Sequence, residues 1–396
     1  MKKQAQEETM TRLAIDGGTP VRTAGWPAWP VWEEADRVRL GQVLESAEWG
    51  GYNPIVREFE QAFAASVGVP HAISAPNGSL TLQAALQVLG VGPGDEVVVP
   101  PYTFIATAFC VTQLGARPVF ADVDAATLNL SADAFRAAIT DRTKAVIPVH
   151  FAGLPADMDA IGAVAADAGI PVIEDAAHAH GSSWRGQRVG SIGAMASFSF
   201  QASKNMTSGE GGVCTTADDD LAERLWSVGN LGRVRDGQWY EHPHLGTNYR
   251  MSGWAAAVLM GQLERLDAQV DRRMAAARYL SDRLGPGLTP VAWDRRADRH
   301  SFHLYCLRYD AAAFGGLSRD DFVAALTAEG VPASGGYPMS LSRQPVFAPY
   351  DPADCPVSDA VCDEIVWFTQ KLLLADDHDL DDIVEAVAKI RSAVEG

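Results

Sequence analysis

The sequence predicts an α/β fold with a mostly parallel sheet covered by helices on both faces, followed by a smaller α+β domain. Between residues 96 and 175, short strands that are apolar along their length alternate with helical segments. This alternation is typical of a parallel sheet that is buried on both faces. After residue 300 the alternation stops, and a strand, a helix, a loop and a final helix follow.

The elements follow from apolar spacing and from residues that cap or break helices. We expect an irregular arm at residues 11–30, which are rich in glycine, proline and tryptophan. We expect strands at residues 96–99, 118–123, 144–149, 170–175, 194–200, 213–216 and 302–309. We expect helices at about residues 32–46, 79–90, 131 onward, 157–166, 218–228, 252–284, 318–329 and 380–394, with another opening within 100–107.

The chain of 396 residues is long enough for two domains. Charge clusters at residues 271–273 and 294–299 indicate a crossing into a smaller domain. We therefore predict an N-terminal arm at residues 1–30, a large domain at 31–265 and a small C-terminal domain at 266–396.

Composition excludes several kinds of partner. The formal net charge of −18 provides no basic field for nucleic acid or for an anionic membrane. The five cysteines are scattered without CxxC spacing, which is typical of reduced thiols. The first residues lack the apolar stretch of a secretion signal, and no apolar run is long enough to span a bilayer. We expect a cytoplasmic protein.

One lysine, Lys204, lies in an otherwise uncharged turn that is rich in hydroxyls and glycine, directly after the expected strand 194–200. An amine at the mouth of a parallel sheet is poorly solvated, which lowers its pKa and favours the free base. A free amine of this kind is what Schiff-base formation with a carbonyl requires. The alternative is an ordinary surface lysine on a glycine turn.

Asp175 ends the expected strand 170–175, where ligands of open α/β sheets bind. A carboxylate at that place can keep a pyridine nitrogen protonated, and pyridoxal phosphate (PLP) sites pair an Asp with a Schiff-base Lys in this way. Three residues later, His178 could contact the phenolic oxygen of the ring.

The residues Asn77-Gly78-Ser79 open an expected helix, whose free amides and dipole would attract an anion such as a phosphate. Phe104 could stack on an aromatic cofactor, and the loop at 49–54, with Tyr52, could contact a polar ring. Each also has a plainer interpretation: an N-cap without ligand, a core phenylalanine and a glycine turn.

Together these residues resemble the PLP-dependent aminotransferases of the DegT/StrS type, which belong to fold type I and aminate keto-sugars or keto-cyclitols. The resemblance runs from Ile15 to the last helix. Its most specific segments are Pro101-Tyr-Thr-Phe-Ile-Ala-Thr107, Glu174-Asp-Ala-Ala-His-Ala-His-Gly181 and Ser197-Phe-Ser-Phe-Gln-Ala-Ser-Lys-Asn-Met-Thr-Ser-Gly-Glu-Gly-Gly212.

The resemblance implies roles for individual residues. Lys204 would be the Schiff-base lysine and proton carrier, and Asp175 would hold the pyridine nitrogen. The other implied cofactor residues are Gly78, Ser79 and Ser199 at the phosphate, Phe104 on the ring, His178 at the phenolic oxygen, and Gln201. Asn248 would reach the phosphate of a partner subunit, which implies a homodimer with shared sites, and Tyr337 and Arg343 lie in a segment similar to the family's substrate loop.

Gln201 stands where many members carry histidine, as in some cyclitol-directed members. The segment Gly17-Gly-Thr-Pro-Val-Arg22 favours the same group. We therefore expect amino transfer from L-glutamine or L-glutamate to a free cyclic ketone of antibiotic biosynthesis, the partners being these small molecules. A nucleotide-linked keto-sugar aminotransferase, and a synthase that dehydrates and aromatises a cyclic amino-ketone, remain alternatives.

Two further classes are weaker. The pairs His178/His180 and Asp157/Asp159 could suggest a metal hydrolase, but metal ligands on a helix are spaced four apart, so we expect no metal. A PLP-binding regulator without turnover would consume no amino donor.

Overall fold

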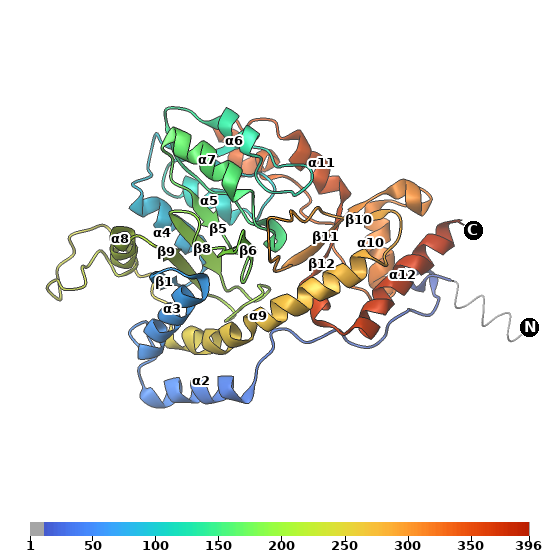
Figure 1. Cartoon of the computed structure of the whole chain (residues 1–396), viewed down its shortest axis with the longest axis horizontal. Helices are drawn as coiled ribbons and strands as arrows, with labels where there is room; N and C mark the ends of the chain where they lie inside the picture. Colours follow the sequence, from blue (N-terminus) through green and yellow to red (C-terminus); the bar gives the residue numbers. More distant parts are fainter. Residues whose placement is uncertain (1–11, 396) are drawn as a thin grey trace, which may run out of the picture.

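The computed structural model describes residues 12–395 and contains one large, mostly parallel sheet (Figure 1). Strands join in two groups with the orders β1-β9-β8-β5 and β4-β2-β3. Parallel bridges from Val146 to Val172 and from Val149 to Asp175 connect these groups into one sheet. The strands are β1 (His71–Ala75), β2 (Glu96–Val99), β3 (Arg117–Phe120), β4 (Thr143–Val146), β5 (Ile173–Asp175), β8 (Met195–Ser199) and β9 (Gly212–Thr216).

Only β9 runs against the other strands, since it pairs antiparallel with both β1 and β8. This inserted strand returns the chain from the carboxyl edge of the sheet to its opposite edge. The predicted mostly parallel sheet is confirmed.

Helices cover both faces of the sheet, as predicted. Apolar residues of α4, α5 and α8 pack on one face, while those of α3, α6, α7 and α9 pack on the other. The helices of this part are α2 (Glu34–Ser46), α3 (Pro54–Val67), α4 (Gly78–Val88), α5 (Ala106–Thr112), α6 (Ala132–Ala138), α7 (Met158–Ala168), α8 (Asp219–Gly229) and α9 (Gly253–Ser281).

The C-terminal part forms a second sheet, antiparallel and in the order β10-β11-β12. Its strands are β10 (Leu288–Pro290), β11 (Leu304–Tyr309) and β12 (Ile365–Thr369), and its helices are α10 (Arg319–Ala328), α11 (Pro356–Glu364) and α12 (Asp377–Glu395). The smaller elements of the chain are the hairpin β6 (Ser183–Trp184) and β7 (Gln187–Arg188), and the 3₁₀ turns η1 (Ala14–Asp16), η2 (Phe151–Gly153), η3 (Ala311–Phe314), η4 (Leu341–Arg343), η5 (Pro345–Tyr350) and η6 (Leu372–Leu374).

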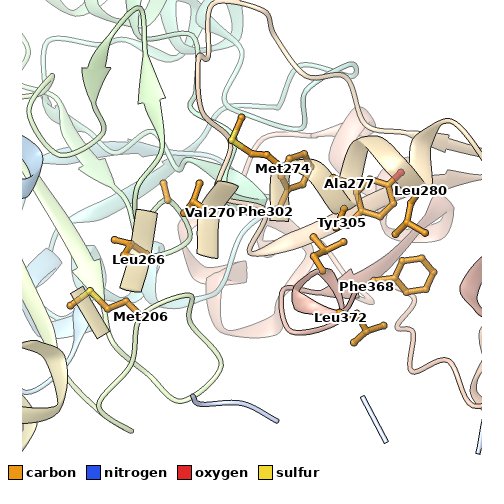
Figure 2. Packing of buried hydrophobic residues seen from close by; sticks show 14 of the residues in the cluster. Met206, Leu266, Val270, Met274, Ala277, Leu280, Phe302, Tyr305, Phe368 and Leu372 are labelled. Atoms are coloured by element: carbon orange, nitrogen blue, oxygen red, sulfur yellow. The ribbon is translucent and has the colours of Figure 1, made fainter. Parts of the chain in front are cut away.

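The long helix α9 connects the two parts (Figure 1). Near its start it packs on α2 and α3, and further along it packs on η6 and α12. Figure 2 shows Val270, Met274 and Leu280 of α9 among the same buried residues as Tyr305 and Phe368 of the C-terminal sheet. The boundary predicted at residues 265/266 falls inside this helix, and the division into three domains stays a prediction.

The N-terminal arm is fixed to the C-terminal part. Arg22 pairs with Asp379 and Asp382 at 2.7 Å each. The fully buried Glu329 accepts hydrogen bonds from the backbone amides of Ala14 and Val21 and pairs with Lys389. These contacts hold the arm against the C-terminal part, although the arm contains little regular secondary structure.

Residues 1–11, the first part of the predicted arm, lie outside the described residues. The same residues are those in which the sequence predicts no secretion signal. None of the helices between residues 12 and 395 combines the length and the apolar character needed to cross a bilayer.

Candidate active site

A cavity of about 800 Å³ lies at the carboxyl ends of β5 and β8, next to the first turn of α4. Most of the site residues predicted from the sequence line it: Gly78, Ser79, Phe104, Asp175, His178, Ser199, Gln201, Lys204 and Tyr337. The parallel sheet is the reason they meet, since strands in the same direction place their carboxyl ends at one edge.

Lys204 lies in the turn between β8 and β9. Its backbone amide donates to the carbonyl of Gln201 at 2.9 Å, and the hydroxyl of Thr207 donates to the carbonyl of Phe200 at 2.9 Å. Burial lowers the pKa of the Lys204 amine to about 8, and the nearby Asp175 only partly opposes this. Within the described residues, Nζ of Lys204 takes part in no hydrogen bond or salt bridge. The lowered pKa raises the share of free amine near neutral pH, which favours Schiff-base chemistry.

Asp175 ends β5 inside the cavity. Its Oδ2 accepts a hydrogen bond from the hydroxyl of Thr107 at 2.8 Å, and its Oδ1 accepts one from the amide of Ala177 at 3.2 Å. Burial raises the pKa of the Asp175 carboxyl, and these hydrogen bonds and Lys204 offset that effect only in part. A carboxylate with few donors in a buried site would gain from a cationic N–H partner.

His178 presents a hydrogen-bond donor to the same cavity. Its Nδ1 accepts from the backbone amide of Ala152 at 3.3 Å, which places the ring proton on Nε2. Burial, and then the Lys204 charge, hold the pKa of His178 well below its usual value. The imidazole is therefore neutral and offers Nε2–H.

The start of α4 forms an anion cradle. Asn77 caps the helix by accepting the amide of Leu80 at 3.0 Å, and the amides of Gly78 and Ser79 have no acceptor within the helix. A Cβ atom at Gly78 would lie 2.7 Å from Cβ of Ser199, so only glycine lets the helix end approach β8 this closely. Backbone amides and the hydroxyls of Ser79 and Ser199 form a donor set that suits a phosphate.

Gly212 is required for the same approach from the next strand. A Cβ atom there would lie 2.4 Å from the carbonyl carbon of Asn77. Gly78 and Gly212 thus bring the α4 turn against the edge of the sheet.

Two further predicted residues, Phe104 and Gln201, line the cavity. The Phe104 side chain, which precedes α5, is 57% exposed and leaves its ring free for stacking. Gln201 holds the turn before Lys204, because its Oε1 accepts both the amide and the hydroxyl of Ser203 at 2.8 and 2.7 Å.

Three predicted residues lie elsewhere. Tyr52 lines a different groove, with its ring 5.2 Å from the guanidinium of Arg250. Asn248 is exposed and accepts the amide of Arg250, while Arg343 pairs with Asp359 at the surface. Their predicted roles in cofactor or substrate binding stay predictions.

The cavity also contains residues that sequence reasoning did not assign. They are Thr103, Thr107, Ala177, Glu210, His303 and Trp367, among others. Thr107 lies inside a segment that was recognised as specific, yet no local pattern indicated that its hydroxyl bonds Asp175. His303 and Trp367 come from the C-terminal part, and only the tertiary fold brings them here.

The donor set fits pyridoxal phosphate. The backbone at Gly78, which leaves no room for a side chain, suits the phosphate. The buried Asp175 carboxylate suits the ring nitrogen, and the Lys204 amine suits the aldehyde. No cluster of three or more metal-ligating side chains occurs within residues 12–395.

Comparison with known proteins agrees with this chemistry. The model of the DegT/DnrJ/EryC1/StrS aminotransferase family matches residues 31–388. The chain is 41% identical to 3-amino-5-hydroxybenzoate synthase of Amycolatopsis mediterranei (strain S699), over 92% of this chain and 96% of the relative.

A second relative is the putative L-glutamine:3-amino-2,3-dideoxy-scyllo-inosose aminotransferase of Streptomyces kanamyceticus, 39% identical over 96% of this chain and 97% of the relative. Among solved structures, 3-amino-5-hydroxybenzoic acid synthase superposes with a TM-score of 0.87 at 39% identity, covering 94% of this chain and 100% of that one.

Proposed function

The chain belongs to the DegT/DnrJ/EryC1/StrS aminotransferase family, and we propose that it transfers the amino group of L-glutamine or L-glutamate to the ketone of a cyclitol. It is a PLP-dependent aminotransferase of fold type I. The observation that carries the proposal is that Lys204, Asp175 and the α4 cradle open into one cavity.

We assign the chemistry to this chain's residues as follows. When bound, PLP supplies an electron sink for the pair of electrons released at the substrate carbon. Asp175 holds a proton on the ring nitrogen by pairing with the N–H. Nζ of Lys204, whose lowered pKa raises the share of free amine, would move the proton between the substrate carbon and the cofactor in both halves of the reaction.

The remaining residues bind and orient. The amides of Gly78 and Ser79 and the hydroxyl of Ser199 hold the phosphate. Phe104 stacks on the ring, Nε2–H of His178 donates to the phenolic oxygen, and Gln201 keeps the Lys204 turn in place.

We further propose a homodimer in which Asn248 reaches the partner's phosphate. Asn248 belongs to the segment after α8 that also exposes Trp239, Tyr240 and Leu245, each at least 77% exposed. Large apolar side chains gathered on one exposed segment are typical of an interface. Tyr52 and Arg343, which lie outside the cavity of their own chain, would be placed by the same assembly.

The dimer has a direct test. Mixing a Lys204→Ala variant with an Asn248→Ala variant, after reversible dissociation, would form some dimers with one intact site. Recovery of activity from two inactive proteins supports the shared site, and no recovery in confirmed mixed dimers contradicts it.

The relatives' names favour a carbocyclic acceptor and L-glutamine as the donor. One observation supports a second candidate: the 41% identical relative is a synthase whose product name is aromatic, so this chain could form an aromatic amine. The free cysteines at all five positions support a reducing compartment, and we propose the cytoplasm.

A single assay separates these functions. The PLP-loaded protein is given L-glutamine and, in turn, a keto-inositol, a nucleotide-linked keto-sugar and the cyclic amino-ketone precursor of an aminobenzoate. We expect amination of the keto-inositol and complete loss of turnover in Lys204→Ala. Turnover by that variant at the normal rate would refute the assignment of Lys204, and ultraviolet absorbance of an aromatic product would identify the second candidate.

A further inference from the structure

Two imidazole rings lie face to face in the wall of the cavity. The rings of His178 and His303 have centroids 4.3 Å apart and planes inclined by 33°. His178 follows β5 of the large sheet, whereas His303 directly precedes β11 of the C-terminal sheet. Both line the cavity that holds Lys204.

Hydrogen bonds fix which nitrogen of His303 carries the proton. The amide nitrogen of Asn205 donates to the carbonyl of Ser301 at 2.7 Å, which leaves Oδ1 of Asn205 as an acceptor. That oxygen lies 3.1 Å from Nδ1 of His303. His303 therefore carries its proton on Nδ1, and Nε2 is a lone-pair acceptor.

Nε2 of His303 faces the cavity. It has no hydrogen-bond partner among residues 12–395. Both ring nitrogens of His180 also lack a partner but are fully buried, whereas Nε2 of His303 is not among the fully buried atoms. Burial, the largest cause, keeps the pKa of His303 well below its usual value, so the acceptor stays unprotonated.

The two rings thus have opposite hydrogen-bonding properties. His178 offers a donor at Nε2, and His303 offers an acceptor at Nε2. The phenolic oxygen of the cofactor, when ionised, can accept from His178 but has no proton to give to His303. The cofactor oxygen therefore cannot donate to His303, whereas a hydroxyl group of the substrate can.

We propose that Nε2 of His303 accepts a hydrogen bond from a hydroxyl group next to the ketone of the acceptor, and so selects hydroxylated rings. The inference rests on the proposed function and names the feature of the ketone that is recognised. Trp367 and Tyr337, whose rings meet edge to face at 5.3 Å, line the same cavity and offer apolar surface to the C–H faces of such a ring.

The test compares 2-hydroxycyclohexanone with cyclohexanone as acceptors for the enzyme first aminated with L-glutamine. We expect the wild type to prefer the hydroxy-ketone about tenfold to a hundredfold in kcat/KM, because an unfilled buried acceptor is costly. His303→Asn keeps a polar group near Nδ1 for Asn205 but removes Nε2, and should lose this preference. His303→Gln places an amide near the position of Nε2 and should restore much of it.

Two controls separate recognition from structural damage. His300→Asn changes a buried histidine that lies outside the cavity, and should leave the preference unchanged. The absorption spectrum of the PLP-loaded His303→Asn protein, and its pH titration, should match the wild type.

Three outcomes would overturn the inference. One is a preference that survives in His303→Asn. Another is a wild type that reacts equally, or not at all, with the two ketones while its reaction with glutamine proceeds. The third is a spectral shift in His303→Asn, which would assign the residue to the cofactor. Failure of the amination step with both L-glutamine and L-glutamate would instead refute the proposed function.

Discussion

Glu174 and Asp175 are consecutive carboxylates on β5, and they face opposite sides of the sheet. Both are buried, with 0% and 5% of their surfaces exposed. Glu174 accepts hydrogen bonds from His150 at 3.0 Å and from the amides of Gly190, Ile192 and Gly193 at 2.8–3.0 Å. Within residues 12–395, the Asp175 carboxylate accepts only from Thr107 and Ala177.

The pKa values of the two groups move in opposite directions. Burial alone would raise the pKa of Glu174, but His150 and the backbone amides bring it below its usual value. Burial raises the pKa of Asp175, where the donors are too few to compensate. The difference teaches that a buried carboxylate can be fully satisfied by its own chain, as Glu174 is, or left short of donors that a ligand would supply, as Asp175 is.

Asp175→Asn should break the functional side of this comparison with the largest effect. The amide keeps the shape but cannot hold a proton on the ring nitrogen, so we expect turnover to fall by about a thousandfold or more. The melting temperature of the cofactor-free variant should not fall, because an unfavourable buried charge is removed. Steady-state kinetics and calorimetry measure the two effects, and near-normal single-turnover rates would contradict the role.

Glu174→Gln should break the structural side. It removes the charged acceptor of the buried hydrogen bond from His150 and turns an NH₂ group toward backbone amides, which we expect to cost about 3 kcal/mol of unfolding free energy. Turnover per folded molecule should change by less than about tenfold. Urea unfolding measures the loss, and a variant as stable as the wild type would show that Glu174 is not a structural anchor.

The pH dependence of stability sharpens the comparison, since the two carboxylates should act with opposite sign. Glu174, with its lowered pKa, contributes stability above its unfolded pKa of about 4.3, and this is lost as the pH falls through the folded pKa. Asp175, with its raised pKa, costs stability as the pH rises from about 3.9 through its folded pKa.

Urea unfolding of the cofactor-free protein across this acidic range tests the sign. We subtract the unfolding free energy of each variant from that of the wild type. With rising pH, this signed difference should increase for Glu174→Gln and decrease for Asp175→Asn. We expect changes of the order of 1 kcal/mol. Slopes of the same sign would refute the contrast.

Thr107→Val should give the smallest effect. It deletes one of the two donors to Asp175 while keeping the shape, so the pKa of Asp175 should rise further and turnover should fall by about fivefold. Thr103→Val is the matched control, because Thr103 is also buried in the cavity wall but bonds Thr107 rather than Asp175. Equal losses in both variants would indicate a general packing effect.

The positions of Asp175 and Lys204 in one cavity could be predicted from the sequence because local rules place them. Each directly follows an apolar strand of a parallel sheet, and parallel strands end at the same edge. The α4 turn was also local, since Asn77 caps the helix as expected. Most of the alternating strands and helices of the large part were predicted for the same reason.

Other features were missed although their signals exist. Val56, Phe59 and Phe63 have helical spacing in α3, but the prediction stopped at Pro54, which proves to be the first residue of that helix. The short strands β1, β10 and β12 were also not predicted. The reversed direction of β9 depends on which strands flank it, and local apolar runs carry no information on direction.

Residues that meet only through the tertiary fold could not be predicted. His303 reaches the cavity because β11 packs beside η2, far from it in the chain. Its acceptor state depends on Asn205 and Ser301, which lie 98 and two positions away. The roles that we propose for Tyr52, Asn248 and Arg343 would likewise need a partner subunit, which the sequence of one chain does not place.

The N-terminal arm also ends beside the turn that contains Lys204. The indole nitrogen of Trp29 donates to the carbonyl of Ala202 at 3.0 Å, and the guanidinium of Arg273 lies 5.4 Å from its ring. Indole emission is sensitive to such polar neighbours, so this residue is a built-in optical probe. Subtracting the fluorescence of Trp29→Phe from that of the wild type, which has ten tryptophans, should follow cofactor loading without any added dye.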